Sequence, residues 1–394
     1  MAFEKDGLSE TEIKRFQELS RLAKGDIITM TTLAASGHPG GSISSLDIYL
    51  VLFSFAKIEN EPRDRIIISH GHTSPGVYSA LARLGHLPVD EVVAFFRKGG
   101  SPFEGHVVKG IPFIDWSTGN LGQGLSAGCG LAIASKIKKL DNHIYVAMGD
   151  GEQQKGQIGE ARRFAKKYGL HNITVIIDYN NLQISGSIYS VMPQNIAENY
   201  LSDGWDVIEI NGHNYNEIYL AFKKARYTDN PTCILARTVM GHGIGFMEHK
   251  EKYHGSPLNT NEYKEAVSIL SIEDRLDYYR ELRKGKWSFV SKKSDENIPD
   301  IDTGKPRTYT KDDKIDNRTA FGNALKDIAD LLGLKSVKEA EYAIHLVSMK
   351  KRHANKQLCP CGCGLRLGKC KLNEKIKHFR ALKPRSWFRS IIDN

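Results

Sequence analysis

Two oxygen-bearing side chains follow two apolar segments near the middle of the chain. Asp150 comes just after the segment 144–148, and Asn180 just after the segment 173–178. If both segments are parallel strands, their carboxyl ends meet at the edge of an open α/β sheet where ligands bind. Carboxylate and amide oxygens suit Mg²⁺, which also takes phosphate oxygens, and the glycines flanking Asp150 let a diphosphate approach the backbone. The pattern predicts a metal-bridged diphosphate site.

The spacing around these residues carries a family resemblance. Gly149-Asp150-Gly151, then 28 residues, then Asn180-Asn181 resembles the thiamine diphosphate motif in the form found in transketolases. Six further segments resemble transketolases in the same order between about residues 15 and 265: 36–41 (SGHPGG), 64–72 (DRIIISHGH), His106, 119–124 (GNLGQG), 241–248 (GHGIGFME) and 253–255 (YHG).

The resemblance implies how the chain would hold thiamine diphosphate. Asp150, Asn180 and the backbone carbonyl of Leu182 match the ligands of a Mg²⁺ or Ca²⁺ ion. Ile184 matches the apolar residue packed against the thiazolium ring. The remaining cofactor contacts would come from the glycine-rich segments, at Gly119, Asn120, Leu121, Gly149 and Gly151.

Four histidines match those that line the substrate channel of transketolases and move protons there. Histidine suits this work because its pKa lies near the working pH. Three other histidines, His70, His213 and His242, have no such match, and we assign them no role. The resemblance therefore implies four catalytic residues, namely His38, His72, His106 and His254.

One residue departs from the family pattern. After Gly-Asp-Gly, transketolases commonly continue to Gln-Glu-Gly, and the glutamate joins an acidic cluster across the subunit interface. This chain has Gln154-Lys155-Gly156, although Glu160 is retained. Reversing a charge changes how neighbouring carboxylates pair and share protons. Either a partner subunit compensates for the reversed charge of Lys155, or communication between the active sites across the subunit interface is lost.

The elements around these motifs predict an α/β fold with an open, mostly parallel sheet and helices on both faces. Apolar segments separated by helical stretches are typical of such a sheet. The domain would span residues 1–285 and end at a polar, Pro/Gly-bearing linker, 286–315. Strands are predicted at 144–148, 173–178, 205–210 and 232–238, and helices at 9–35, 45–56, 90–97 and 121–140.

The stretch 316–334 resembles the first helix of a transketolase pyrimidine-binding domain. The rest of that domain, which carries the catalytic glutamate of the family, is not recognisable in 335–394. The resemblance implies that a separate C-terminal transketolase subunit would supply it, in a dimer or heterotetramer. Together the subunits would transfer a two-carbon ketol unit between sugar phosphates.

The positive charge of the chain is concentrated near its end. From Leu331 onward there are 15 Lys and Arg against 4 Asp and Glu, whereas the first 330 residues hold 40 and 42. Such asymmetry favours an attached module that meets an anionic partner, possible examples being nucleic acids. A basic surface that only aids solubility explains the charge equally well.

Four cysteines lie within a stretch of twelve residues inside this basic tail. In a cytosolic protein this density favours zinc over disulfides. The pattern resembles the C-terminal zinc motif of SecA-type proteins, but Lys371 stands where that motif continues with Cys or His. Cys363 or His378 could complete a tetrahedral site. The predicted zinc ligands are Cys359, Cys361, Cys363 and Cys370.

The chain has no sign of export or membrane insertion. Residues 1–16 lack the apolar core of a signal peptide, and nowhere do eighteen apolar residues run together. We therefore expect a cytoplasmic protein without a membrane partner.

Two functions from different classes remain open at this point. The first is the diphosphate-binding subunit of a split transketolase, inactive without its partner. The second is a truncated transketolase homologue that acts as a binding protein through its basic zinc tail. A third, an acid dehydrogenase subunit of the same superfamily, fits the histidine pattern less well. The matching metal ligands and histidines favour the first.

Overall fold

The computed structural model describes residues 2–290 continuously and only short pieces of the remainder. It divides into two units, Met1–Ser294 and Asp295–Asn394. Most of the predicted linker, pyrimidine-domain helix and tail, including Cys361 and Cys363, lies outside the described residues. Among the helices described, none is both long and apolar enough to span a membrane. Beyond residue 290 the structure describes 309–310, 312–313, 315, 319, 322–323, 326–327, 355, 357, 359 and 365–370.

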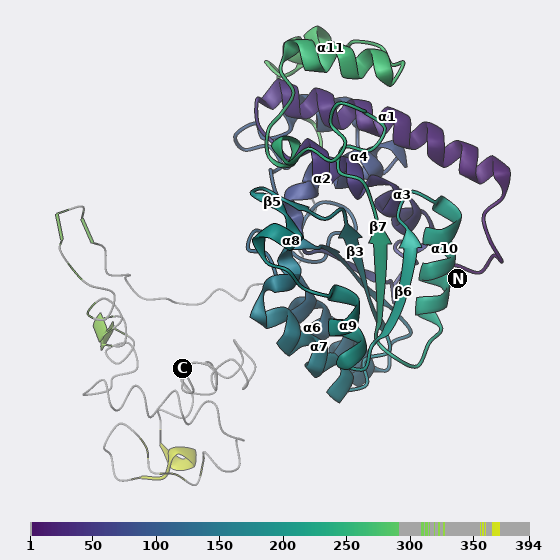
Figure 1. Ribbon diagram of the computed structural model, residues 1–394. Coiled ribbons are helices and arrows are strands. Elements are labelled where there is room, and N and C mark those ends of the chain that lie inside the picture. Colours follow the sequence, from purple (N-terminus) through teal and green to yellow (C-terminus); the bar gives the residue numbers. More distant parts are fainter. Residues whose placement is uncertain are drawn as a thin grey trace. The chain divides into compact units, whose positions relative to one another are not determined.

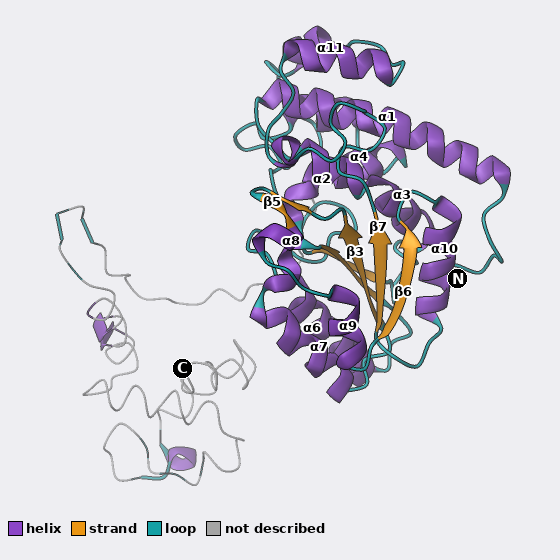
Figure 2. Ribbon diagram, in the orientation of Figure 1, coloured by secondary structure: helices purple, strands orange, loops and turns teal. Residues whose placement is uncertain are grey.

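The first unit is built on a five-stranded sheet in which every neighbouring pair is parallel. This confirms the predicted α/β fold with a parallel sheet (Figures 1 and 2). After β3 the chain passes to β6 at the edge of the sheet and then returns to form β7 between β3 and β6. The spatial order is β1 (Arg65–Ile68), β2 (Ile144–Gly149), β3 (Ile173–Tyr179), β7 (Thr232–Arg237) and β6 (Asp206–Asn211).

Both faces of the sheet are covered by helices. Along β2, Tyr145 and Ala147 enter one hydrophobic cluster, while Ile144, Val146 and Met148 enter the other. Successive side chains of a strand point to opposite faces, so a strand covered on both sides is apolar throughout. Helices α3, α4 and α10 pack on the first face and α6, α7 and α9 on the second, while α1 and α11 lie further out (Figure 1).

The four helices that the sequence predicts by range are found as α1, α3, α5 and α6 among twelve described α-helices. They are α1 (Glu10–Ala34), α2 (Pro39–Ser44), α3 (Leu46–Phe55), α4 (Ser74–Arg83), α5 (Val89–Phe95), α6 (Gly124–Lys138), α7 (Gly156–Lys167), α8 (Ile188–Val191), α9 (Ile196–Ser202), α10 (Tyr215–Arg226), α11 (Thr260–Ile269) and α12 (Leu276–Leu282). The described elements also include four 3₁₀ turns and a small antiparallel pair of strands. The turns are η1 (Gly71–Thr73), η2 (Gly151–Gln154), η3 (Glu251–His254) and η4 (Leu367–Lys369), and the strands are β4 (Leu182–Gln183) and β5 (Gly186–Ser187).

Local interactions set the helix boundaries. Ser9 caps α1 by accepting a hydrogen bond from the Glu12 amide, and the Glu12 carboxylate accepts one from the Ser9 amide, a reciprocal cap that stabilises helix starts. The helix predicted at 121–140 begins three residues late because Gly122 has φ 85°, outside the helical region. It ends where Lys139 turns left-handed at φ 54°.

Both ends of the first unit pack onto its body. The ring of Phe3 lies 5.6 Å from that of Tyr219 and 5.4 Å from that of Phe222, on α10. At the other end Trp287 packs on Phe95 at 5.8 Å, and Phe289 stacks on Phe103 at 5.6 Å. The packed unit therefore includes the first residues of the stretch predicted as a linker from residue 286.

Two glycines on α6 test how closely this helix approaches the sheet. A Cβ on Gly128 would lie 2.7 Å from the Val146 side chain, whereas one on Gly130 would meet nothing within 4 Å. We expect Gly128→Ala to destabilise the unit by about 1–3 kcal/mol through overpacking. The matched Gly130→Ala should stabilise it by up to about 1 kcal/mol, because alanine favours helix. Denaturant unfolding measures both, and equal effects would contradict the packing.

Candidate active site

A cavity of about 580 Å³ lies at the carboxyl ends of β1, β2 and β3. It brings together nearly all the residues for which the sequence predicts a catalytic, cofactor-binding or magnesium-binding role. Asn120 is the exception, since it does not line the cavity and its side chain is exposed. The lining includes His38, His72, His106, Gly119, Leu121, Gly149, Asp150, Gly151, Asn180, Leu182, Ile184 and His254.

Asp150 has the surroundings of a cation ligand. It is 2% exposed, and its Oδ2 accepts a hydrogen bond of 2.6 Å from the Asn181 amide. Burial raises the pKa of Asp150 to about 8, and the nearby charge of Asp178 adds to the rise. A divalent cation would stabilise the charged carboxylate instead. The oxygen ligands that Mg²⁺ prefers are present beside it.

Asn180 and Leu182 reach the same place through a tight turn. Asn180 ends up beside Asp150 because it follows β3, the strand paired with β2. Its Oδ1 accepts a hydrogen bond of 3.0 Å from the Leu182 amide, and Asn181 between them is left-handed at φ 64°. Left-handed backbone is uncommon outside glycine and is best tolerated by Asn and Asp. The turn therefore places two predicted metal ligands together.

Asp178 is a buried, cavity-lining acid that the sequence analysis missed. Its carboxylate accepts hydrogen bonds from Ser44 Oγ at 2.5 Å, from Ser45 Oγ at 2.6 Å and from Thr238 Oγ1. These contacts fasten the junction of α2 and α3 and the segment after β7 to β3. A signal was present, because an acidic residue stands in an apolar strand two positions before Asn180 and so on the same face.

Glu152 is a second buried acid that the sequence analysis missed. It accepts hydrogen bonds from Ser69 Oγ at 2.6 Å, from the Gly122 amide at 2.7 Å and from the Gly149 amide at 3.0 Å. Burial raises its pKa, and the hydrogen bond from Ser69 opposes the rise. One carboxylate thus holds three cavity-lining segments in register. Nothing in the sequence distinguished it from other acids near the motif.

The four predicted histidines lie close together in the lining of this cavity. The ring centroid of His38 lies 5.0 Å from that of His72, 5.8 Å from that of His254 and 6.3 Å from that of His106. Burial lowers the pKa of all four, that of His38 to about 4. They are therefore neutral at pH 7. Each can accept a proton from a hydroxyl and return it.

His70, to which the sequence analysis gave no role, also lines this cavity. It is 2% exposed, and its Nε2 lies 2.5 Å from the hydroxyl of Tyr49, which lies 2.6 Å from Thr73 Oγ1. Its Nδ1 faces the backbone at Gly149, where an added Cβ would be 3.3 Å away. His70 supports the wall beside the glycine-rich turn. Its position two residues after the apolar run 66–68 was the available signal.

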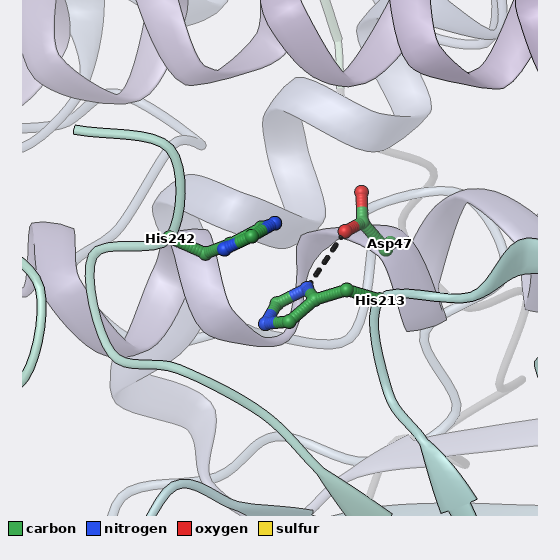
Figure 3. A group of neighbouring side chains, drawn as sticks. All are labelled: Asp47, His213 and His242. Atoms are coloured by element: carbon green, nitrogen blue, oxygen red, sulfur yellow. Dashed lines mark hydrogen bonds and ion pairs between the residues drawn. The ribbon is translucent and has the colours of Figure 1, made fainter. Parts of the chain in front are cut away.

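Figure 3 shows a separate cluster of Asp47, His213 and His242, whose ligand-type atoms lie within 4.8 Å of one another. His213 Nδ1 donates to Asp47 Oδ2 at 2.9 Å, and its Nε2 accepts from the Val239 amide at 2.9 Å. Both ring nitrogens are therefore engaged, and His213 offers no lone pair to a metal. The His213 and His242 rings stack at 3.7 Å. The cluster joins α3 to two loops and is structural.

Lys155, the departure from the family pattern, borders the cavity beside the glycine-rich loop. Its Cβ and Cγ would lie 2.7 Å from a Cβ on Gly122, so the side chain packs directly over that glycine. Glu160 is exposed on α7, one turn further along. The substitution leaves the surroundings of Asp150 intact.

Comparison with known proteins decides the family. The family model described as "Transketolase, thiamine diphosphate binding domain" matches residues 15–288. The chain belongs to the transketolase family. The transketolase of Campylobacter jejuni has a similar fold, with a TM-score of 0.62 and 29% identity over 68% of this chain and 45% of that one. The cavity described above lies within the thiamine diphosphate-binding domain of this family.

The matches to relatives differ in how much of each relative they cover. The transketolase of Pongo abelii is 34% identical over 76% of this chain, but the match spans only 48% of that protein. One subunit of the apulose-4-phosphate transketolase of Phocaeicola vulgatus is 34% identical, over 66% of this chain and 94% of that protein. The 6-deoxy-6-sulfo-D-fructose transketolase subunit SqwG of a Clostridium species is 37% identical over 60% and 89%. The chain thus spans about half of a full-length transketolase and matches nearly the whole of two separate subunits.

Acidification should destabilise the first unit through its buried, neutral histidines. Burial lowers the pKa of His70 to about 4, against an ordinary value of 6.5. The unfolded state therefore binds more protons between these values, and stability falls as the pH is lowered from 6.5 towards 4, by up to about 1.4 kcal/mol per pH unit for each such group. His70→Gln should flatten the fall of Tm between pH 7 and 5. The exposed control His171→Gln should not, and identical slopes would refute the assignment.

Proposed function

We propose that this chain is the diphosphate-binding subunit of a split, thiamine diphosphate-dependent transketolase. With a C-terminal subunit it would transfer a two-carbon ketol unit between sugar phosphates. The observation that carries the proposal is the single cavity in which Asp150 and Asn180 lie together with four neutral histidines. The two relatives matched over 94% and 89% of their length are both named as transketolase subunits, which supports a split enzyme.

The residues at the sheet edge fit a magnesium-bound diphosphate. Asp150, Asn180 and the carbonyl of Leu182 would hold Mg²⁺ or Ca²⁺, since the buried Asp150 carboxyl has only amide hydrogen bonds to offset its charge. Gly119, Gly149 and Gly151 would let the diphosphate lie against the backbone. When bound, thiamine diphosphate supplies the nucleophilic carbon and the electron sink for cleaving a ketose, chemistry that side chains lack.

The histidines would handle the protons of the sugar. His38 Nδ1 and His254 Nδ1 are buried and without a partner among the described residues, so both imidazoles can take new hydrogen-bonding partners. The ring of His72 lies 5.0 Å from that of His38 and 5.3 Å from that of His254. Together they would hold the hydroxyl groups of the substrate and pass protons at the reacting carbons.

The far side of the cavity has features of a surface that a partner covers. Three large apolar side chains there are well exposed: Ile184 at 70%, Tyr189 at 59% and Met192 at 52%. All belong to the segment of β4, β5 and α8 next to the cavity. Exposed apolar groups gathered in one segment mark interaction sites. The partner would bring the pyrimidine-binding domain and its glutamate to this segment.

Asp150→Ala tests the cofactor site directly. We expect it to abolish Mg²⁺-dependent binding of thiamine diphosphate while Tm stays near that of the parent, because the lost group is an uncompensated buried carboxyl. Titration calorimetry with and without Mg²⁺ measures this. The exposed Asp141 provides a matched control, and Asp141→Ala should bind as the parent does. Unchanged affinity in Asp150→Ala would remove the assignment.

A ketol-transfer assay with sugar phosphates, thiamine diphosphate and Mg²⁺ tests the activity. We expect no turnover by the chain alone and turnover after addition of a C-terminal transketolase subunit from the same source. No turnover in either case, with a C-terminal subunit shown to be active with another N-terminal subunit, would favour the binding-protein alternative.

The cysteine cluster gives a further expectation. Of its ligands the structure describes Cys359, whose amide donates to the Leu365 carbonyl at 2.8 Å, and Cys370. We propose that the cluster holds about one zinc ion per chain, the content expected of a four-ligand site. Elemental analysis should find it in the full chain and not in a Cys359→Ser/Cys361→Ser variant. Metal-free parent protein would rule the site out.

A further inference from the structure

The buried pair of Asp47 and His213 does not itself line the cavity. Asp47 lies on α3 and is 2% exposed, and its Oδ2 accepts a hydrogen bond of 2.9 Å from His213 Nδ1. Two further donors, Ser20 Oγ at 2.7 Å and the Tyr215 hydroxyl at 3.0 Å, satisfy its Oδ1. Burial raises the pKa of Asp47, but the hydrogen bond from His213 and the charge of Lys24 outweigh that effect, so the pKa lies below its ordinary value. Asp47 is therefore a fixed, ionised acceptor.

The contacts of His213 select one protonation state of its ring. Nε2 faces the Val239 amide at 2.9 Å, and because an amide N–H can only donate, Nε2 must carry a lone pair. Nδ1 faces an ionised carboxylate, which can only accept, so the single ring proton stays on Nδ1. Asp47 thus selects the tautomer that can hold Val239. A ring with its proton on Nε2 would set donor against donor.

A second imidazole holds the ring of His213 in place. His242 stacks on it with the ring centroids 3.7 Å apart and an interplanar angle of 20° (Figure 3). Burial lowers the pKa of His242 to about 4, so this ring is neutral at pH 7. His242 and Val239 belong to the same loop, residues 238–254, which follows β7. His213 therefore contacts this loop twice, through a hydrogen bond and through a stacked ring.

Both ends of the loop 238–254 pack against the first turn of α2. Near its start, the Gly241 amide donates to the Gly40 carbonyl at 3.2 Å. A Cβ on Gly40 would lie 2.8 Å from Met240 Cγ and 2.8 Å from the Tyr253 carbonyl oxygen. Contacts this close leave the loop and the helix no room to move independently.

These contacts adjoin two of the predicted catalytic histidines. Gly40 lies two residues after His38, and Tyr253 directly precedes His254. The His38 and His254 rings are 5.8 Å apart, and a Cβ on Gly255 would lie 3.7 Å from His38 Cδ2. A displacement of the loop would therefore change how the two rings face each other.

We propose that His213 is a positioning residue for His38 and His254. In the tautomer that Asp47 selects, it would hold the Val239 amide and, through it, the loop 238–254, without touching cofactor or substrate. The inference rests on the proposed function, because it takes the two positioned rings to handle the protons of the sugar. A misplacement of about 1 Å at a reacting group can lower turnover about a hundredfold.

Two substitutions at His213 separate its two hydrogen bonds. In His213→Asn the side-chain amide can reach the place of Nδ1 and donate to Asp47, but Val239 is left without an acceptor. In His213→Gln the longer side chain can bring its amide oxygen to the place of Nε2 and accept from Val239. Asp47→Asn acts on the tautomer instead, because a side-chain amide can donate to Nδ1 and so favours the ring proton on Nε2.

Imidazole NMR of the full chain, carrying isotope-labelled histidine, reads the positioned rings without requiring turnover. The signals of His38 and His254 are identified by their loss in His38→Gln and His254→Gln. We expect His213→Asn and Asp47→Asn to shift or broaden these signals, and His213→Gln to leave them close to those of the parent. The exposed control His171→Asn should leave them unchanged.

Ketol transfer with the C-terminal subunit gives the functional readout. His213→Asn should lower turnover about tenfold or more, and His213→Gln should retain most of it. The affinity for thiamine diphosphate should stay at the parent value in both variants, because the surroundings of Asp150 do not involve the loop.

Two results would overturn the proposal. One is a folded His213→Asn variant in which Tm falls while the signals of His38 and His254 stay in place, which would show that the pair only stabilises the fold. The other is an equal change of these signals in His213→Asn and His213→Gln, which would show that the acceptor for Val239 does not matter. The His213 variants decide the question even if Asp47→Asn does not fold. Failure of the proposed function is read separately, from a parent chain without ketol transfer.

Discussion

Three carboxyl groups buried at the carboxyl edge of one sheet govern the arrangement of this domain. Burying a charge is costly unless it is paired or well hydrogen-bonded. Asp178 accepts four hydrogen bonds and Glu152 three from within the chain. Asp150 receives only amide hydrogen bonds, and its pKa rises to about 8. The fold thus satisfies two acids with the help of side-chain donors and leaves the third, the predicted metal ligand, with backbone amides.

The satisfied acids also explain how distant loops converge. Asp178 draws the segment that follows His38 onto β3, and Glu152 draws the loop after β1, with His70 and His72, towards the glycine-rich loop. The spacing of His38 and His72 therefore depends on hydrogen bonds made by neighbouring residues and not by the histidines themselves. His38 Nδ1 and His254 Nδ1 have no hydrogen-bond partner among the described residues, whereas His70 is engaged by Tyr49.

Sequence reasoning was strongest where a pattern repeats and weakest where an interaction is unique. The apolar segments between helical stretches sufficed to predict the parallel sheet, and the resemblance in the motif segments placed all but one of the predicted cofactor, magnesium and catalytic residues at the cavity. The contacts of Glu152 and His70 could not be predicted in this way. Each depends on which backbone amide, hydroxyl or glycine the finished fold brings to it, and that information is spread over segments far apart in the chain.

The packing of the N-terminal residues has a consequence for how the domain forms. Phe3 packs against Tyr219 and Phe222, and α1 contacts α11 and α12. The larger hydrophobic cluster therefore cannot close until some 280 residues have been synthesised. Helix α1 can pack early on α3, α4 and α5, but Phe3 and the part of α1 that contacts α11 and α12 wait for later segments. Assembly on the ribosome would therefore leave the earliest-made segment incompletely packed for longest.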